Sequence, residues 1–511
     1  MQSAMGKTCR SHALLYYGIL VLLLCQCHAK LMPEDIKSYL VSQDGNGFDE
    51  FKSIPKSGDD ISPYSYSTST MNKRNLQIAQ LAITEGIPFN GEGNLEDRFG
   101  SSLALSDDGS FCVIGAIGKS PTVGANNGTG YVMAFMRSGG DASWTQMGQT
   151  IYGNNTGDRF GDEIKMSSDG QTIVVGSRNA EGETGRNNIG IVRVYTYDGK
   201  GLWNQLGNDI PGEDRGDLSG VGVAVSSDAR IVAIGTGRND DPNSNNGHVR
   251  VYRYDEMATP PQWVQVGDDI NGEAAEDQSG NNIAMSSDGT IVAIGARFND
   301  GTNGTNTGHV RVYKYNGIAW NQLGSDLDGE AVDDESGFDV AISSAGDIVA
   351  IGARFNDGEN GMVSDAGHVR VYQLNDDAIP EWVKMGNDID GQGQNDQSGR
   401  NIDMSSDGMT LIIGSSLADD GSFNEGAARI YKWVDDANDW IQHGDTIYGL
   451  QRADQAGFDV AISGDAGTIL VGSRNHDDSA DPDNQNSGTA RLYQIEKAST
   501  GGGKVLLLYM K

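Results

Sequence analysis

The chain has 511 residues and a formal net charge of −34 at pH 7. Because a nucleic-acid-binding protein needs a basic surface to displace phosphate counterions, this charge excludes nucleic acid as a partner. The 71 glycines, the 11 prolines and the 37% of hydrophobic residues indicate many short strands joined by tight turns, and they do not fit a disordered chain.

The segment 1–29 has the pattern of a secretory signal peptide. Lys7 and Arg10 precede an apolar run from residue 13 to residue 24, and Ala29 ends a small-residue cleavage site. The run is too short to span a bilayer as a helix. We therefore predict that residues 1–29 are removed and that the protein is secreted or lies on the extracellular surface. An uncleaved signal anchor is the alternative.

Cleavage would leave Cys112 as the last of the four cysteines, so the mature chain could form no intrachain disulfide. Cys112 lies in the apolar run 111–114, which indicates a small buried side chain. Residues 30–75 show no sustained periodicity and are predicted to be a disordered linker. Residues 498–511 are predicted to be a C-terminal tail, whose apolar end is too short for a lipid-anchor signal.

Between these segments the sequence repeats at a nearly constant interval. A marker glycine begins each unit, and a second glycine follows it at the same distance in all seven units, as Gly115 follows Gly100 and Gly295 follows Gly280. Six units also carry the motif Trp-x-x-x-Gly, beginning at Trp144, Trp203, Trp263, Trp320, Trp382 and Trp440. The first markers are Gly100, Gly161, Gly220, Gly280, Gly337, Gly399 and Gly457. Such long-period repetition predicts a propeller or another repeat architecture.

Each unit is predicted to form four short strands. In the fourth unit these are 282–285, 290–294, 310–313 and 320–323, and a Ser-Ser-Asp-Gly turn joins the first two. Asp and Gly tolerate the positive φ of such turns, so the two strands should be antiparallel neighbours. Small residues such as Ala284 in the first strand suit the crowded centre of a propeller. A recurring arginine in the third strand, such as Arg311, is expected to be structural or solvated.

The pairs Phe99-Gly100 and Phe160-Gly161, followed by Val-Ile-Gly-Ala at 113–116 and its variants, resemble the FG-GAP repeat of integrin α chains and many extracellular proteins. The resemblance covers residues 86–496. It implies an all-β, seven-bladed β-propeller of four-stranded antiparallel blades over residues 76–497. The phenylalanine is replaced by serine in four units and by Ala456 in another, so this chain diverges from the family pattern.

The last unit lacks a fourth strand, because it ends after Leu492-Tyr493. Residues 83–91 precede the first unit and repeat the glycine interval that follows a fourth strand. We therefore predict that this N-terminal segment completes the seventh blade and closes the ring.

A carboxylate precedes every marker glycine at the same position, and in four units an arginine follows at the exit of the second strand. These pairs, such as Asp277 and Arg297, are expected to face each other across a hairpin. Two interpretations are open: turn-capping aspartates with local ion pairs, or a ring of carboxylates at the channel mouth that holds a cation. The carboxylates are Asp97, Asp158, Asp217, Asp277, Asp334, Asp396 and Asp454.

Calcium remains open as a ligand, and no other cofactor is predicted. The Asp-rich calcium loop of integrin-type repeats is replaced here by Ser-Ser-Asp-Gly, which supplies too few oxygens. The loops between the second and third strands are rich in Asp and Asn and are a second candidate site for calcium. His248, His309 and His368 lie on successive blades, too far apart to share one zinc ion.

Both acidic loop sets should gather on one face of the propeller, together with the glycosylation sequons at Asn127, Asn154 and Asn303. Glycans there would leave blades five to seven as the free surface, suited to a basic protein or a cation-bridged glycan. The alternative is that these acids only keep the protein soluble. The candidate binding residues are Asp357, Glu359, Asp365, Asp419, Asp420, Asp477, Asp478, Asp481 and Asp483.

No Ser/His/Asp or Cys/His set stands out from the repeat, so we predict a monomeric, extracellular recognition scaffold for a protein or glycan and not an enzyme. The alternatives are an enzyme acting on an extracellular polysaccharide and a structural matrix component without a discrete ligand. Carboxylates with raised pKa values in one pocket would favour the enzyme.

Overall fold

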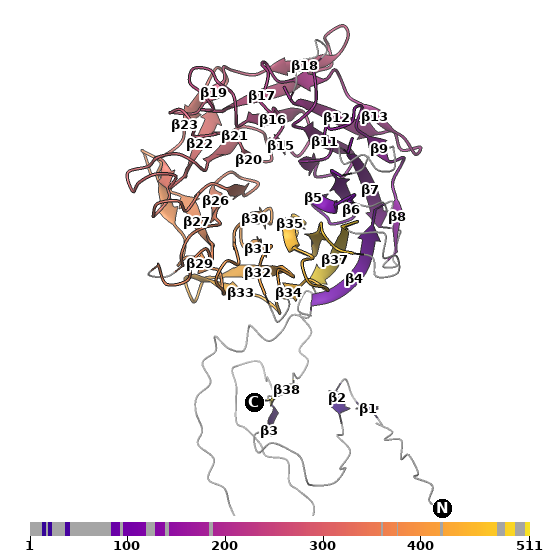
Figure 1. The fold of residues 1–511 in the computed structure, drawn as a ribbon. Coiled ribbons are helices and arrows are strands. Elements are labelled where there is room, and N and C mark those ends of the chain that lie inside the picture. Colours follow the sequence, from indigo (N-terminus) through magenta and orange to yellow (C-terminus); the bar gives the residue numbers. More distant parts are fainter. Residues whose placement is uncertain are drawn as a thin grey trace, which may run out of the picture. The chain divides into compact units, whose positions relative to one another are not determined.

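The computed structural model describes residues 13–16, 19–22, 36–40, 83–91, 96–118, 128–137, 143–182, 188–358, 361–375, 377–419, 423–477, 486–495 and 506–510. Contacts divide the chain into a unit of Lys73–Glu496 and a unit made of Met1–Asn72 and Lys497–Lys511. The larger unit is a seven-bladed β-propeller, whose blades form a ring (Figure 1) around a central channel lined by their first strands.

The first four blades are antiparallel sheets, each with four strands in sequential order and a short fifth strand paired to the third. Blade 1 consists of β5 (Phe99–Leu105), β6 (Phe111–Ala116), β7 (Tyr131–Arg137), β8 (Trp144–Gln146) and β9 (Ile151–Tyr152). Blade 2 consists of β10 (Ile164–Met166), β11 (Thr172–Ser177), β12 (Ile191–Tyr197), β13 (Trp203–Gln205) and β14 (Ile210–Pro211). Blade 3 consists of β15 (Gly222–Val225), β16 (Ile231–Thr236), β17 (His248–Asp255), β18 (Gln262–Gln265) and β19 (Ile270–Asn271). Blade 4 consists of β20 (Asn282–Met285), β21 (Ile291–Ala296), β22 (His309–Tyr315), β23 (Trp320–Gln322) and β24 (Leu327–Asp328).

The remaining blades repeat this pattern until the last, which borrows its outer strand. Blade 5 consists of β25 (Asp339–Ile342), β26 (Ile348–Ala353), β27 (His368–Leu374), β28 (Trp382–Lys384) and β29 (Ile389–Asp390). Blade 6 consists of β30 (Asn401–Met404), β31 (Thr410–Ser415), β32 (Ala427–Val434), β33 (Asp439–Gln442) and β34 (Ile447–Tyr448). Blade 7 consists of β35 (Ala456–Ile462), β36 (Thr468–Ser473), β37 (Thr489–Ile495) and β4 (Ile83–Asn90).

The strand β4 closes the ring, as the sequence predicted. It runs antiparallel to β37, with Ile83 opposite Ile495 and Asn90 opposite Thr489. The N-terminal strand thus supplies the edge that the last repeat lacks, and it covers β37 as a fourth strand covers the third strand in the other blades.

The repeated turn between the first and second strands is held by its own side chains. In blade 4 the Ser286 hydroxyl donates to Asp288 at 2.8 Å and accepts a hydrogen bond from the Ile291 amide at 3.0 Å. Asp288 also accepts from the Thr290 amide, and Gly289 has a φ of 72°. Serine, aspartate and glycine thus each have their own role in this turn.

The two marker glycines meet both within a blade and between blades. The Gly280 amide donates to the carbonyl of Gly295 at 3.0 Å in the same blade. A Cβ atom on Gly235 of blade 3 would collide with the carbonyl oxygen of Gly280. The constant interval between the two markers thus reflects one hairpin, and the second glycine permits the close approach of the next blade.

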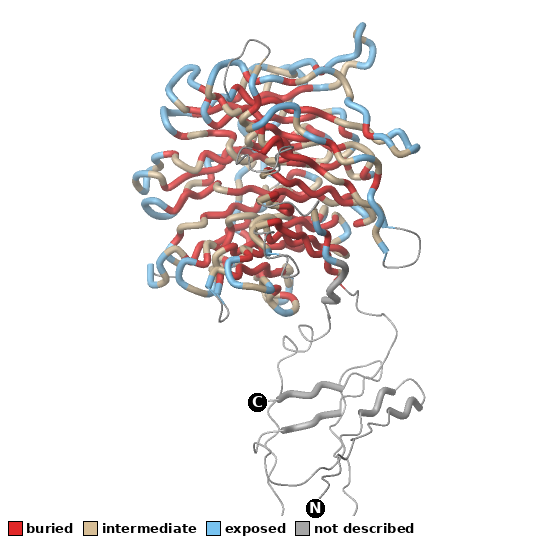
Figure 2. The backbone as a smooth tube through the Cα atoms, turned by 45° about the vertical axis from the view of Figure 1, so that its right-hand side comes forward, coloured by how far each residue is buried: buried red, intermediate tan, exposed pale blue. Residues whose placement is uncertain are grey.

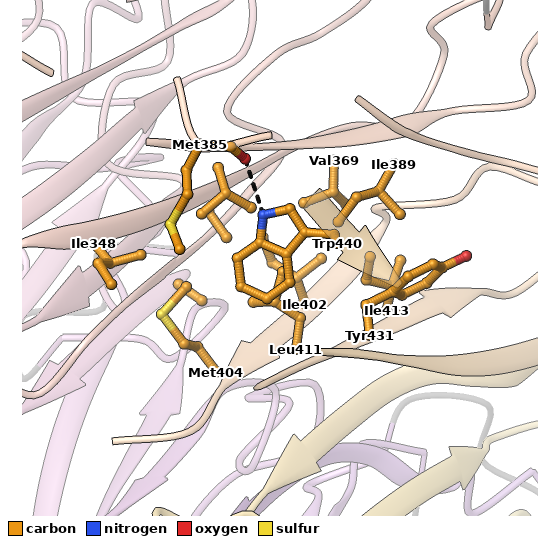
Figure 3. Close-up of a cluster of buried hydrophobic side chains, with 13 residues drawn as sticks. Ile348, Val369, Met385, Ile389, Ile402, Met404, Leu411, Ile413, Tyr431 and Trp440 are labelled. Atoms are coloured by element: carbon orange, nitrogen blue, oxygen red, sulfur yellow. Dashed lines mark hydrogen bonds between the residues drawn. The ribbon is translucent and has the colours of Figure 1, made fainter. Parts of the chain in front are cut away.

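The hydrophobic core lies between blades. Seven buried clusters each combine side chains from two neighbouring blades, and the exposed residues lie mainly in the loops (Figure 2). Figure 3 shows the cluster between blades 5 and 6, where the Trp440 indole donates a 3.0 Å hydrogen bond to the carbonyl of Met385. Met385 precedes the glycine of the blade 5 Trp-x-x-x-Gly motif. The motif therefore joins each tryptophan to the blade before it, with equivalent bonds from Trp203, Trp263, Trp320 and Trp382.

The third-strand arginines are buried and also join blades. Arg311 donates to the carbonyl of Asn271 in blade 3 at 2.9 Å and lies 5.6 Å from the centre of the Tyr313 ring. Arg250, Arg370 and Arg491 make the same kind of bond to the preceding blade. Of the two expectations for this arginine, the structural one is correct.

The second unit contains two strand pairs that the sequence patterns did not predict. Strand β1 (Ala13–Tyr16) pairs with β2 (Ile19–Leu22), and β3 (Ile36–Leu40) pairs with β38 (Leu506–Met510). The described part of the chain contains no helical segment that could traverse a membrane.

Candidate functional site

The central channel contains a cavity of about 210 Å³, lined by the first strand of every blade. Small residues such as Ala224 and Ala284 line part of it, as predicted. In four blades, charged residues in or just before the first strand line it instead, and the repeated positions of the sequence did not predict them. These are Glu163, Lys165, Asp339, Asp403 and Asp459. The signal was present in the sequence, since they occupy the second and fourth positions after the marker glycine.

The channel aspartates bind the next blade around the ring. Asp339 accepts a hydrogen bond of 2.6 Å from the Ile402 amide, and Asp459 accepts one of 2.6 Å from the Leu103 amide. The side-chain amide oxygen of Asn401 makes the equivalent bond to Val460 at 2.8 Å. Since asparagine serves equally well in blade 6, this position needs an acceptor and not a charge.

Burial disfavours the charged forms of these aspartates. It raises the pKa of Asp339 to about 7, although the nearby Lys165 ammonium opposes the shift. Burial also raises the pKa values of Asp403 and Asp459. Lys165 lies 2.9 Å from Glu163 and is the one basic group among the described residues that line this cavity. The channel thus contains carboxylates with raised pKa values, as expected of an enzyme, but all three of them accept hydrogen bonds from backbone amides.

At one end of the channel the seven first-to-second-strand turns form a closed circle of hydrogen bonds. The Asp107 amide of blade 1 donates to Ser168 of blade 2 at 3.1 Å, and each blade repeats this step toward the next. The Asp465 amide of blade 7 donates to the carbonyl of Asp107 at 3.0 Å and so closes the circle. We call this set of bonds the turn circle.

At the opposite end, on the face formed by the loops, arginines gather from all seven blades. We call this face the loop face and define the arginine ring as Arg98, Arg159, Arg178, Arg238, Arg297, Arg354, Arg400 and Arg474. They lie at the start of first strands or the end of second strands. Their charges act on one another across non-adjacent blades: Arg297 is influenced by Arg178, and Arg474 by Arg159.

Phenylalanine rings separate the guanidinium groups on blades 4 to 7. Phe338 has Arg354 at 3.9 Å, Arg297 at 5.2 Å and Arg400 at 5.5 Å from its ring centre. Phe458 has Arg474 at 3.5 Å and Arg400 at 4.6 Å. Such cation–π contacts orient the planar guanidinium groups in fixed positions.

Carboxylates neutralise only part of the arginine ring. Asp162 binds Arg178 at 2.7 Å and Arg159 at 2.8 Å, and Glu335 binds Arg354 at 3.0 Å.

The other guanidinium groups on blades 4, 6 and 7 have neutral partners or none. Arg297 and Arg474 contact the neutral side chains of Gln278 and Gln455, and the guanidinium group of Arg400 makes no hydrogen bond or ion pair with any described residue. Burial and the surrounding arginines lower the pKa of Arg474 to about 9 and those of Arg297 and Arg400 to about 10.

The predicted Asp–Arg pairs were wrong. Asp277 is buried and accepts hydrogen bonds from the Ala274 amide at 2.9 Å and from Asn299 at 3.1 Å, whereas Arg297 contacts Gln278. The residue after each repeat aspartate has a left-handed φ, 52° at Gln278. The arginine of blades 4, 5 and 7 therefore meets this next residue and not the aspartate.

The repeat aspartates accept hydrogen bonds within the protein. They are buried, and six of them accept a hydrogen bond from a backbone amide of the loop before the marker glycine; Asp97 accepts one from the Tyr131 hydroxyl. The six are Asp158, Asp217, Asp277, Asp334, Asp396 and Asp454. The turn-capping interpretation thus describes their contacts, and the charged ring at this end is cationic.

The acidic loops between second and third strands also use their carboxylates internally. Asp357 accepts from the Asp365 amide at 3.0 Å, Asp477 accepts from the Asn486 amide at 2.6 Å, and Asp419 accepts from the Asn424 amide. All three remain exposed, while Asp365 is half-buried. The other predicted binding residues lie outside the described residues, namely Glu359, Asp420, Asp478, Asp481 and Asp483. These contacts also occupy oxygens that a calcium ion would need.

The three histidines each have their own acidic partners. His248 lies 3.6 Å from Asp269 and groups with Glu213, and His309 and His368 head equivalent groups in blades 4 and 5. A metal-bound histidine needs an acceptor for its second ring N–H, yet Nε2 of all three is buried without a hydrogen-bond partner among the described residues. Arg250 already lies 3.3 Å from Glu213. Burial lowers the pKa of His248 to about 4, so this histidine is neutral near pH 7.

The sequons differ in their surroundings. Asn154 is exposed, and Asn303 is exposed but donates its side-chain amide to the carbonyl of Gly329 at 2.8 Å. Asn127 lies outside the described residues. A glycan on Asn303 would replace one of the two hydrogens on the nitrogen that makes this bond.

Comparison with known proteins assigns neither a family nor a function to this chain. No protein-family model matches the sequence, and no curated protein matches it either. Among solved structures, the chain is similar to a protein from Bacteroides uniformis ATCC 8492 that has been proposed to be a 6-phosphogluconolactonase, with 11% identity and a TM-score of 0.47. The match covers 68% of this chain and 85% of that one. The chain is a seven-bladed, all-β propeller.

Proposed function

We propose that the chain is an extracellular recognition scaffold that binds its ligand at the loop face and is not an enzyme. The observation that carries this proposal is the arginine ring: guanidinium groups from every blade gather at one end of the channel in a chain with a net charge of −34. Charged groups held in place without internal partners are typical of binding sites. The FG-GAP resemblance supports an extracellular role of this kind.

The proposed ligand contact is therefore the centre of the loop face and not the acidic loops that the sequence predicted. The loop aspartates accept hydrogen bonds from their own loops, whereas the guanidinium group of Arg400 has no hydrogen-bond or ion-pair partner among the described residues. A protein or a glycan with acidic groups fits this centre better than the basic protein expected from the acidic loops.

The test is capture by the recombinant chain beginning at Lys30. Glycan arrays and extracellular protein extracts should give a ligand that the wild type binds and the double variant Arg400→Ala/Arg474→Ala does not. Arg253→Ala is the matched control, because Arg253 is exposed on β17, outside the arginine ring. Equal binding by all three proteins would contradict recognition through the arginine ring, and no capture at all would favour a matrix component.

A polysaccharide-acting enzyme is the second candidate, favoured by the raised pKa values of Asp339, Asp403 and Asp459. Against it, their hydrogen bonds to neighbouring blades and the presence of Asn401 at an equivalent position account for these groups as structural. Turnover of any polysaccharide that is lost in Asp339→Asn, with folding retained, would establish the enzyme instead.

Secretion and glycosylation complete the proposal. The mature protein should begin near Lys30 and carry a glycan at Asn154, which is exposed. Mass spectrometry of material released by the producing cells tests both points. A membrane-retained product beginning at Met1 would show that the signal acts as an anchor.

A further inference from the structure

The loop face contains cationic groups that the fold itself does not neutralise. On blades 4, 6 and 7, Arg297, Arg400 and Arg474 have no carboxylate partner among the described residues, and Nε of Arg297 is buried without a hydrogen bond. In blade 5 the equivalent guanidinium of Arg354 is bound by Glu335. The same position is Gln278 in blade 4 and Gln455 in blade 7, so these blades lack the internal anion that blade 5 supplies.

These guanidinium groups are held in place before any ligand arrives. Arg297 and Arg400 share the ring of Phe338, and Arg400 and Arg474 share the ring of Phe458. Three like charges are thus kept close together by aromatic contacts, and their N–H donors would not need to be reordered on binding. Because arginines crowd these rings, the rings are not available to stack on a sugar.

The charge around the site limits the size of its ligand. Exposed carboxylates surround the ring, including Asp300, Asp357, Asp419 and Asp477 in the loops. Together with the net charge of −34, they repel a long polyanion that would lie across the loop face. A compact anion avoids most of this repulsion, since screening reduces it beyond about 8–10 Å at physiological salt.

We propose that Arg297, Arg400 and Arg474 form a binding site for a compact anion with two or three negative charges on carboxylate or phosphate oxygens. This inference rests on the proposed function and names the chemistry of its ligand. The anion is either a free small molecule or an acidic group at the tip of a larger partner. Guanidinium groups bind such oxygens in pairs of parallel hydrogen bonds.

The decisive variant supplies the anion from within the protein. In Gln278→Glu/Gln455→Glu, each new carboxylate occupies the position of Glu335 and should bind Arg297 or Arg474 as Glu335 binds Arg354. This variant keeps every arginine and the side-chain shape, so it should fold and should be at least as stable as the wild type. Arg253→Gln serves as the control for a more negative net charge away from the arginine ring.

The experiment is titration of the chain beginning at Lys30 with inorganic phosphate, citrate and polygalacturonate, followed by calorimetry and by the unfolding temperature. We expect phosphate or citrate to bind the wild type and Arg253→Gln equally, and to raise their unfolding temperatures with the logarithm of concentration. Gln278→Glu/Gln455→Glu should bind at least tenfold more weakly. No binding of phosphate or citrate, or equal binding by the glutamate variant, would overturn the inference.

Polygalacturonate distinguishes a long polyanion from a compact anion, and a captured partner distinguishes a free anion from an acidic group on that partner. Tighter binding of polygalacturonate than of citrate would overturn the compact-anion assignment. If citrate displaces a partner captured by the chain, the anion belongs to the tip of that partner; if citrate binds without displacing it, the anion is a free ligand. Capture of a partner by the wild type and by the glutamate variant alike, with no binding of small anions, would leave the recognition scaffold standing and refute this site.

Discussion

The hydroxyl of Thr489 donates a hydrogen bond of 3.0 Å to the backbone carbonyl of Phe89, 400 positions earlier in the chain. This bond lies within the β4–β37 pair that closes the propeller. Phe89 is buried, with its ring 4.7 Å from that of Phe135 in blade 1. One residue of the N-terminal strand therefore contacts both the last blade and the first.

Replacing Phe89 with alanine should lower the free energy of unfolding by about 3–5 kcal/mol, the usual cost of removing a buried aromatic side chain. Phe423→Ala is the control, because Phe423 is 59% exposed and its loss should cost roughly 0.5 kcal/mol or less. Denaturant unfolding of both variants measures the difference. Similar losses would mean that β4 contributes little to closure.

Replacing Trp440 with phenylalanine should destabilise the protein by about 1 kcal/mol more than the same change at Trp433, because removing a buried donor leaves its acceptor without a partner. The indole of Trp440 is buried and binds the Met385 carbonyl of blade 5, whereas that of Trp433 binds Asp435 at an exposed site. Parallel urea titrations compare the two, and a larger loss at Trp433 would contradict the bond between blades.

Stability should fall as pH rises from about 4 to 7, in part because of Asp339. Its pKa is raised to about 7 in the folded protein, so in this range the folded state binds a proton that the unfolded state has released. The slope from this carboxyl is at most about 1.4 kcal/mol per pH unit. Asp339→Asn should reduce the slope and keep the bond to Ile402, as Asn401 does in blade 6. An unchanged pH profile would show that Asp339 titrates normally.

Replacing Asp277 with alanine should destabilise the fold by about 1–3 kcal/mol, since the Ala274 amide and the Asn299 side chain lose a buried acceptor. Asp268→Ala is the control, because Asp268 is exposed in the turn between β18 and β19. Addition of EDTA should leave the unfolding temperature unchanged in wild type and variants, because the capping carboxylates bind protein donors. A fall with EDTA would restore the cation interpretation.

The fold was predictable because its constraints recur at constant intervals. The contact between Gly235 and Gly280 and the bond from Trp440 to Met385 are repeated around the ring, so the same residues reappear in the sequence. The closing strand was predictable because the last repeat lacks a fourth strand and residues 83–91 carry the glycine interval that follows one.

The arginine ring could not be found in this way. Arg98, Arg297 and Arg400 occupy three different positions of the repeat, and folding alone brings them to one end of the channel. The channel aspartates were missed for the related reason that their positions vary among the blades. The wrong Asp–Arg pairs have a local cause, because the left-handed φ of Gln278 redirects the partner of Arg297.

The turn circle has a consequence for where the chain could begin. Every turn in it both donates to one neighbour and accepts from another, so no blade is first or last. Among the described blades, the last one departs from this sequential order, because its outer strand β4 comes from the other end of the chain. A chain whose ends were joined by a linker and reopened in another loop would therefore keep every bond of the circle, with a different blade assembled from two ends of the polypeptide.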